Sequence, residues 1–147
     1  TCALPILKHM LNICLRIKIK LFFQILFLFS FLLNNYSEVG RCGYYVRMAL
    51  EAGGINTNSH PVPARLYGSY LKNWGFSKVN TDKFERGDIA VFQGYPGATA
   101  DKNGVPYGHI QIYNGNQWMA VWHQNGFWPG RGYSVNKASF EIYRWNK

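Results

Sequence analysis

Apolar residues recur at every third or fourth position between residues 42 and 53, which is the spacing of one face of a helix. The residues on this stripe are Cys42, Tyr45, Val46, Ala49, Leu50 and Gly53. The pair Gly53-Gly54 supplies a C-terminal stop at the end of the stripe. The pattern predicts a short amphipathic helix that begins at Cys42.

A second helical pattern follows, and the chain then changes to the period of a strand. Residues Ala64 to Trp74 place Leu66, Tyr70, Leu71 and Trp74 on one side, and Gly75 ends the pattern, although Gly68 in its interior weakens it. β-rich runs then predict a strand at 89–93, a hairpin about Asn114-Gly115 and a final strand at 139–145. We expect an α+β domain with its N-terminal helices packed on a curled antiparallel β-sheet.

The first 34 residues are a different kind of sequence. They carry basic residues without an acid, and the run from Leu21 to Leu33 is interrupted only by Gln24 and Ser30. At about 1.5 Å per helical residue this run reaches roughly 20 Å, which is short of the ~30 Å hydrocarbon core of a bilayer. We therefore predict no stable membrane span. Residues 1–34 are expected to be a hydrophobic basic leader, either a signal or anchor or a non-native extension, and residues 35–147 the folded domain.

Composition and charge narrow the class of protein. The chain has 147 residues, 48% of them hydrophobic, and a formal net charge of +9. This balance favours an anionic partner such as an acidic wall polymer, but the basic residues form no run, so we predict no nucleic-acid binding. Of the three cysteines only Cys42 lies in the domain, which argues against a disulfide framework and leaves one unpaired thiol.

Cys42 and His109 are the candidate catalytic pair. Cys42 stands at the start of the first helix, where unpaired N–H groups lower a thiol pKa, and His109 follows a glycine at the start of a strand. A cysteine that opens a helix, followed by a histidine that opens a strand, is the generic order of Cys-His nucleophilic catalysis. The competing interpretation is a buried apolar cysteine. No metal-ligand spacing supports a zinc site, so we predict neither metal nor cofactor.

Five segments strengthen the catalytic interpretation. In order, GRCGYYVRMALEAGG, RGDIAVFQG, GHIQIYNGNQW, FWPGRGY and FEIYRW resemble the blocks of NlpC-type and CHAP-type cysteine peptidases and amidases, and most of all the bacterial CHAP-like proteins related to type VI secretion amidase effectors. The resemblance covers most of residues 37–145. It implies a papain-like fold that cleaves amide bonds in the stem peptides of peptidoglycan, with Cys42 as nucleophile, His109 as general base and Asp88 as a structural residue.

The residue that orients the base is where the sequence departs from these families. They carry a polar residue about twelve positions beyond the histidine, and here that position is Val121. A two-residue hairpin loop would place Gln124 on the face of His109, whereas a three-residue loop would place His123 there. The family spacing favours His123, which we predict as the third catalytic residue. A backbone carbonyl or a water molecule is the alternative.

Three further residues are predicted to contact substrate. Trp128 and Arg131 lie in a turn-rich segment that would present a bulky ring and a guanidinium group, and the latter could pair with a stem carboxylate. Tyr44 lies next to the nucleophile and could shape the oxyanion site. Core packing for the aromatic residues, and a solvated surface position for Arg131, are the competing interpretations.

The sequence thus predicts a secreted, monomeric peptidoglycan amidase or endopeptidase, either a housekeeping enzyme or an antibacterial effector. Its expected partners are peptidoglycan and, for an effector, an immunity protein; its expected location is the periplasm or the cell wall. Two other functions stay open. One is a catalytically decayed wall-binding or interaction module, to which Val121 lends weight. The other is a papain-like protease or deamidase that acts on proteins.

Overall fold

The computed structural model of the chain describes residues 41–121 and 124–146. Its elements follow the order α2 (Cys42–Ala52), a 3-10 turn η1 (Ala64–Leu66), α3 (Tyr67–Asn73), β1 (Phe76–Val79), β2 (Ile89–Phe92), β3 (His109–Tyr113), β4 (Trp118–Met119), α4 (Arg131–Val135) and β5 (Phe140–Trp145). The predicted leader, 1–34, and His123 lie outside the described residues. Within 41–121 and 124–146, no helix is long and apolar enough to cross a membrane.

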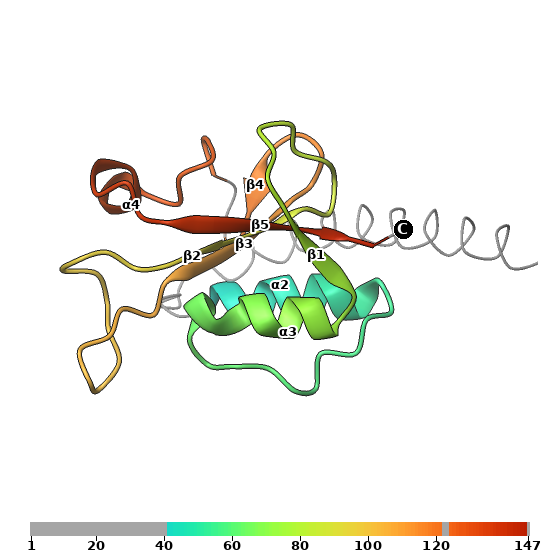
Figure 1. The fold of residues 1–147 in the computed structure, drawn as a ribbon, viewed down its shortest axis with the longest axis horizontal. Helices are drawn as coiled ribbons and strands as arrows, with labels where there is room; N and C mark the ends of the chain where they lie inside the picture. Colours follow the sequence, from blue (N-terminus) through green and yellow to red (C-terminus); the bar gives the residue numbers. More distant parts are fainter. Residues whose placement is uncertain (1–40, 122–123, 147) are drawn as a thin grey trace, which may run out of the picture.

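The strands form one antiparallel sheet in the order β1-β5-β2-β3-β4. The last strand in the chain, β5, therefore lies between the first two. Figure 1 shows α2 and α3 together on one face of this sheet. The α+β class with helices on an antiparallel sheet is confirmed. Among the described strands the sheet is open, with β1 and β4 as its edges.

Helix α2 forms where the apolar stripe predicts it. Cys42, Val46, Ala49 and Leu50 are buried, and the backbone N–H of Gly53 closes the helix on the carbonyl of Ala49 at 3.2 Å. The buried face packs on β3, against Ile110 and Ile112. This contact fixes the start of α2 close to the start of β3.

The second helix differs in the face that it buries. The segment opens as the 3-10 turn η1 and continues as α3, and its buried side chains are Ala64, Tyr67 and Leu71. Leu66, which the sequence pattern placed on the inner face, is 48% exposed. The tighter 3-10 turn shifts the phase of the first residues, and this shift explains the error.

The two faces of the sheet support two separate hydrophobic cores. All four residues of β2 are buried: Ile89 and Val91 face the helices, and Ala90 and Phe92 face a largely aromatic cluster on the opposite side. That second cluster also contains Trp118 and Ile142 and is bordered by Phe127, Trp128 and Tyr133. A strand that is covered on both faces has a continuous apolar sequence, and residues 89–92 show this pattern.

The β3–β4 hairpin has a longer loop than either predicted form. Its register pairs Ile112 with Met119 and Tyr113 with Trp118, so four residues, 114–117, form the loop. The side chain of Asn114 accepts hydrogen bonds from the backbone N–H groups of Asn116 and Gln117, both at 2.8 Å. This side-chain turn stabilises a wider loop than an Asn-Gly pair alone would predict. Strand β4 ends after Met119, before the ladder reaches His109.

Candidate active site

Cys42 is the first residue of α2 and is buried, with 9% of its surface exposed. The backbone N–H groups of Cys42 and Gly43 interact with its sulfur, and so does the backbone N–H of Ile110 in β3. The sulfur therefore faces donors from two elements, the unpaired start of a helix and the edge of a strand.

The short strand β4 explains why the Ile110 N–H is available. The N–H of Tyr113 donates to the carbonyl of Asp88 at 2.8 Å, beside β2, and donors alternate along an antiparallel strand. The N–H groups of Ile110 and Ile112 therefore point to the other side of β3, toward β4. Among the described residues β4 pairs only with Ile112 and Tyr113, so Ile110 has no described strand partner on that side. Its N–H interacts with the Cys42 sulfur instead.

Burial has the largest effect on the thiol. It raises the pKa of Cys42 above its ordinary value, and the three backbone N–H groups lower it by less. The sequence-based expectation of a depressed pKa is therefore wrong in sign. The helix start does favour the thiolate, as predicted, but desolvation of a nearly covered sulfur outweighs it.

His109 opens β3 on the opposite face of the strand from Ile110. The preceding Gly108 has φ +73°, and its α-carbon lies so close to the carbonyl of Phe92 that a side chain at this position would overlap it. This left-handed turn brings the chain from the long 94–108 loop directly into the strand. Burial lowers the pKa of His109 to about 4, while the Gln111 side chain acts in the opposite direction. At neutral pH the imidazole is an uncharged base.

Two buried glutamines surround the imidazole. The side-chain Nε2 of Gln124 lies 3.3 Å from Nε2 of His109. Gln111, two residues along the strand and therefore on the same face, donates from its Nε2 to the carbonyl of Phe127 at 2.7 Å. The Oε1 atoms of both glutamines are buried and have no hydrogen-bond partner among the described residues.

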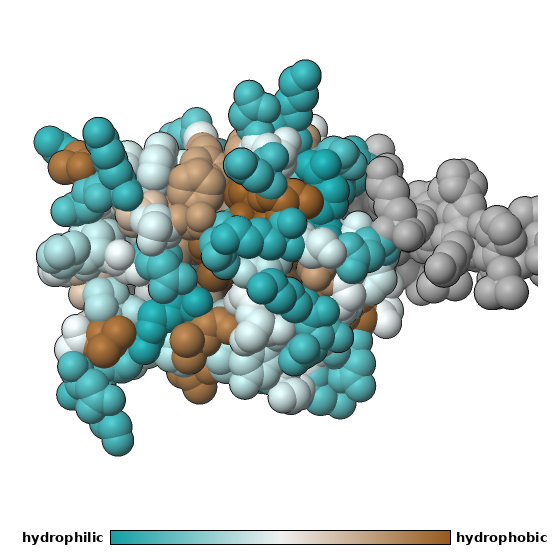
Figure 2. Space-filling view, viewed as in Figure 1, coloured by the Kyte–Doolittle hydropathy of each residue, from teal (hydrophilic) through white to brown (hydrophobic). Residues whose placement is uncertain are grey.

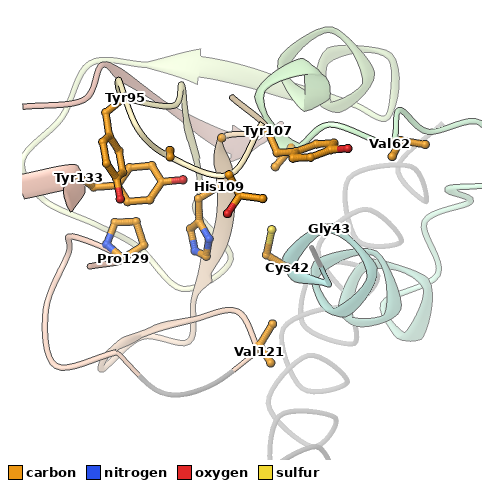
Figure 3. Close-up of a pocket in the computed structure, with 13 residues that line it drawn as sticks. Cys42, Gly43, Val62, Tyr95, Tyr107, His109, Val121, Pro129 and Tyr133 are labelled. Carbon is orange, nitrogen blue, oxygen red and sulfur yellow. The ribbon is translucent and has the colours of Figure 1, made fainter. Parts of the chain in front are cut away.

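Cys42 and His109 line one cavity of about 490 Å³ (Figure 3). Its walls include Tyr95, Tyr107 and Tyr133, and none of the described lining residues carries a formal charge. Val62 at the wall is 82% exposed, so the cavity is continuous with the surface. Figure 2 shows that the apolar patches on the face it presents are separated by hydrophilic side chains.

An ion pair fastens the loop that forms one wall. Arg65 in η1 pairs with Asp101 at 3.1 Å and donates to the carbonyl of Pro106 at 2.7 Å. The backbone N–H of Arg65 donates to the carbonyl of Tyr107 at 2.9 Å. These contacts fix the part of the 94–108 loop that carries Tyr107 and leads to His109.

The predicted substrate residues do not line this cavity. Tyr44 is 49% exposed, and its ring packs edge-on against Tyr45 beneath the Arg47 guanidinium. Trp128 packs against Phe92 in the aromatic core, and Arg131 is exposed at the start of α4. Tyr44 points away because position 44 lies on the outer side of the helix. Val121 does line the cavity.

Sequence reasoning missed Gln111 and the three tyrosines. The signal for Gln111 is the HIQIY pattern itself, since a polar residue two positions after His109 must share its face of the strand. No local signal marks the tyrosines, because a long loop and the short helix α4 bring them to the cavity. Within the described ranges, no cluster of three His, Cys, Asp or Glu side chains could hold a metal ion.

No family model and no curated protein matches the chain, but solved structures do. It is similar to the type VI effector in the crystal structure of the native effector-immunity complex Tae3-Tai3 from Ralstonia pickettii, with 37% identity and a TM-score of 0.63; the match covers 74% of this chain and 85% of that chain. The selenomethionine form of the same complex gives 37% identity and a TM-score of 0.60, covering 71% and 86% of the two chains.

Proposed function

The chain belongs to the family of the type VI effector Tae3, and on this premise we propose that it is an antibacterial peptidoglycan amidase. It would hydrolyse amide bonds of stem peptides in the periplasm of a target cell. One observation carries the chemical part of this proposal. Cys42 from the start of α2 and His109 from the start of β3 line the same open cavity. This is the arrangement that a papain-like cysteine hydrolase of the NlpC or CHAP type requires.

The proposed reaction is acyl transfer through a neutral resting pair. As the Cys42 sulfur attacks the stem-peptide carbonyl carbon, its proton passes to His109, and the N–H groups at the start of α2 stabilise the oxyanion. His109 then gives this proton to the departing amine, the C–N bond breaks and a thioester remains. Water attacks the thioester and releases a proton to His109, and the Cys42 sulfur leaves and recovers it.

We assign the orienting role to Gln124, because Val121, at the position where the families carry a polar residue, has no group that could accept a hydrogen bond. Since Nε2 of His109 is in contact with the Gln124 amide, Nδ1 is the nitrogen left to take the thiol proton. A base at Nδ1 must carry its hydrogen on Nε2, and that hydrogen needs an acceptor. The Gln124 amide, turned so that its buried and unpartnered Oε1 faces the ring, is such an acceptor. The role predicted for His123 stays a prediction.

The proposed partners follow from the family. The similar structures are effector-immunity complexes, so we propose that a cognate immunity protein protects the producing cell from this amidase. The uncharged cavity supports binding of the peptide part of peptidoglycan. The net charge of +9 supports attraction to an acidic wall polymer.

Digestion of purified peptidoglycan by the parent protein and by Cys42→Ala tests this function. Mass spectrometry of the released muropeptides should show a new free amine and a new free carboxyl group for each bond cut. The parent should produce them, and Cys42→Ala should be slower by about 10⁴-fold or more, because removal of a nucleophile leaves only binding and oxyanion stabilisation.

A control should retain the fold and the surrounding packing. Val62→Ala changes an exposed residue at the cavity wall and should digest peptidoglycan at a rate within a few-fold of the parent. Equal product formation by the parent and Cys42→Ala would overturn the proposal. A parent that cleaves casein but no muropeptide would instead support a protease.

A further inference from the structure

Tyr133 on α4 brings a hydroxyl group to the site from the side of His109. Its ring lies 6.0 Å from the imidazole, between centroids, and packs edge-on against Phe92 and Tyr95 at 5.6 and 5.0 Å. Figure 3 shows the Tyr133 hydroxyl directed into the cavity that also contains Cys42 and His109. Aromatic contacts on two sides hold this ring in one orientation.

The hydroxyl of Tyr133 has no hydrogen-bond partner within residues 41–121 and 124–146. Tyr95, its neighbour in the cavity wall, is placed differently. The Tyr95 hydroxyl lies against the α-carbon of Gly132, where any side chain would overlap it, and so rests on the backbone of α4. Of these two neighbouring tyrosines, Tyr133 is the one whose ring packs beside His109.

The position of Tyr133 identifies the part of the substrate that it can reach. The backbone donors around Cys42 define the side of the reacting carbonyl where the oxyanion forms. The departing nitrogen must then lie toward His109, which protonates it. Tyr133 packs beside His109, and therefore lies on the leaving-group side of the scissile bond.

We propose that Tyr133 is a further catalytic residue, whose hydroxyl oxygen accepts a hydrogen bond from the nitrogen of the scissile amide and holds it as it departs. This assignment rests on the proposed amidase function. When His109 protonates the nitrogen, the nitrogen acquires positive charge, and its hydrogen bond to Tyr133 becomes charge-assisted and stronger. The contact thus stabilises the transition state more than the bound substrate, and lowers the barrier.

Tyr133 transfers no proton in this step. Burial, together with the charges of Cys42 and Tyr95, raises the pKa of its hydroxyl to about 12. The group is therefore a neutral hydroxyl over the whole working range of the enzyme. The proton balance stays between Cys42, His109 and the leaving amine.

The test compares Tyr133→Phe with the parent in two reactions of the full chain. The first is hydrolysis of purified muropeptides, and the second is alkylation of Cys42 by iodoacetamide, which releases iodide and needs no protonated leaving group. Tyr133→Phe should lower kcat for muropeptides by about tenfold to a hundredfold and leave KM within twofold. Its alkylation rate should stay within twofold of the parent.

Tyr113→Phe is the matched control, since it makes the same change at a tyrosine that packs in the aromatic core and does not line the cavity. It should match the parent in both reactions. Three results would overturn the assignment: an unchanged kcat in Tyr133→Phe, a raised KM alone, or a parallel loss of hydrolysis and alkylation, which would mean that Tyr133 only supports the Cys42–His109 pair. A parent that fails to cleave muropeptides would overturn the proposed function, whereas an active parent matched by Tyr133→Phe overturns this inference alone.

Discussion

At the scale of single residues, Cys42 and His109 form a pair whose pKa values are shifted in opposite directions by the same cause. Burial raises the pKa of the thiol and lowers that of the imidazole to about 4. The thiol and the imidazole are both uncharged at neutral pH, so we expect proton transfer to accompany attack on the substrate rather than to precede it.

The contact between Gln124 and His109 makes the acid limb of the pH profile a direct readout of this site. Above pH of about 4 the parent imidazole is an unprotonated base, and activity should fall only as the pH drops through that value. A carboxylate at position 124 would stabilise the imidazolium and raise the pKa of His109. In Gln124→Glu the acid limb of kcat/KM should move to higher pH by at least about one unit.

Gln117→Glu provides the matched control for this change. Gln117 lies in the β3–β4 loop, and its side chain has no contact with His109. The same added charge at that position should leave the acid limb within a few tenths of a pH unit of the parent. A Gln124→Glu profile that coincides with the parent profile would contradict the orienting role of Gln124.

The sequence indicates some of these residues and not others. Cys42 and His109 are recognisable because each opens a regular element at a spacing that the family also uses. Gln124 was one of the alternatives, and the choice depended on a hairpin register that the sequence leaves open. Tyr133 could not be predicted, because its position at the cavity depends on how a five-residue helix packs on the aromatic face of the sheet.

At the scale of elements, the site depends on the early end of β4. A longer β4 would also pair with the N-terminal half of β3. Its backbone would then accept a hydrogen bond from the Ile110 N–H, which now faces Cys42. The start of α2 takes the place of that missing strand segment. Cys42, the proposed nucleophile, therefore lies beside His109 at an open edge of the sheet.

Elements with a strong hydrophobic period were the ones that could be predicted. Helix α2 and strands β2, β3 and β5 each begin within one residue of the position that the sequence predicts. Strand β1 and helix α4 were not predicted. The sequence FSKV offers one alternation only, and RGYSV has no buried residue, so both form through tertiary packing rather than local preference.

Gly108 lies directly before β3, and its substitution should reduce the stability of the fold strongly. In Gly108→Ala a side chain would be forced into a left-handed conformation and would also meet the Phe92 carbonyl and, at about 3 Å, the backbone of Arg65. We expect the free energy of unfolding in urea to fall by about 2–4 kcal/mol, from backbone strain and overpacking together.

Gly104→Ala separates the effect of backbone strain from the effect of overpacking. Gly104 has a similar φ of +76°, but nothing lies within 4 Å of the position of an added side chain. The free energy of unfolding of Gly104→Ala should fall by about 1 kcal/mol, from the backbone conformation alone. Equal losses in the two variants would contradict the close approach of the loop, η1 and β2 at Gly108.

At the scale of the whole molecule, the sheet separates two hydrophobic cores, and the cavity forms at the edge of the sheet, between these cores. The helical core holds Cys42, and the aromatic core supports Tyr133 and the face of the sheet that carries His109. Each core therefore supports one part of the proposed catalytic machinery, and Cys42 and His109 meet at the edge between the two cores. An uncharged cavity in a basic protein suits the peptide part of an acidic polymer.

The central claim is that Cys42 and His109 act as one catalytic unit on stem-peptide amides. A double-mutant cycle tests it most directly, with muropeptide turnover measured for the parent, Cys42→Ala, His109→Ala and the double variant. Residues that act as a unit are strongly non-additive, so each single variant should lose about 10⁴-fold or more, and the double variant should be no slower than either. Losses that multiply in the double variant, or a single variant with more than a tenth of the parent rate, would contradict the account.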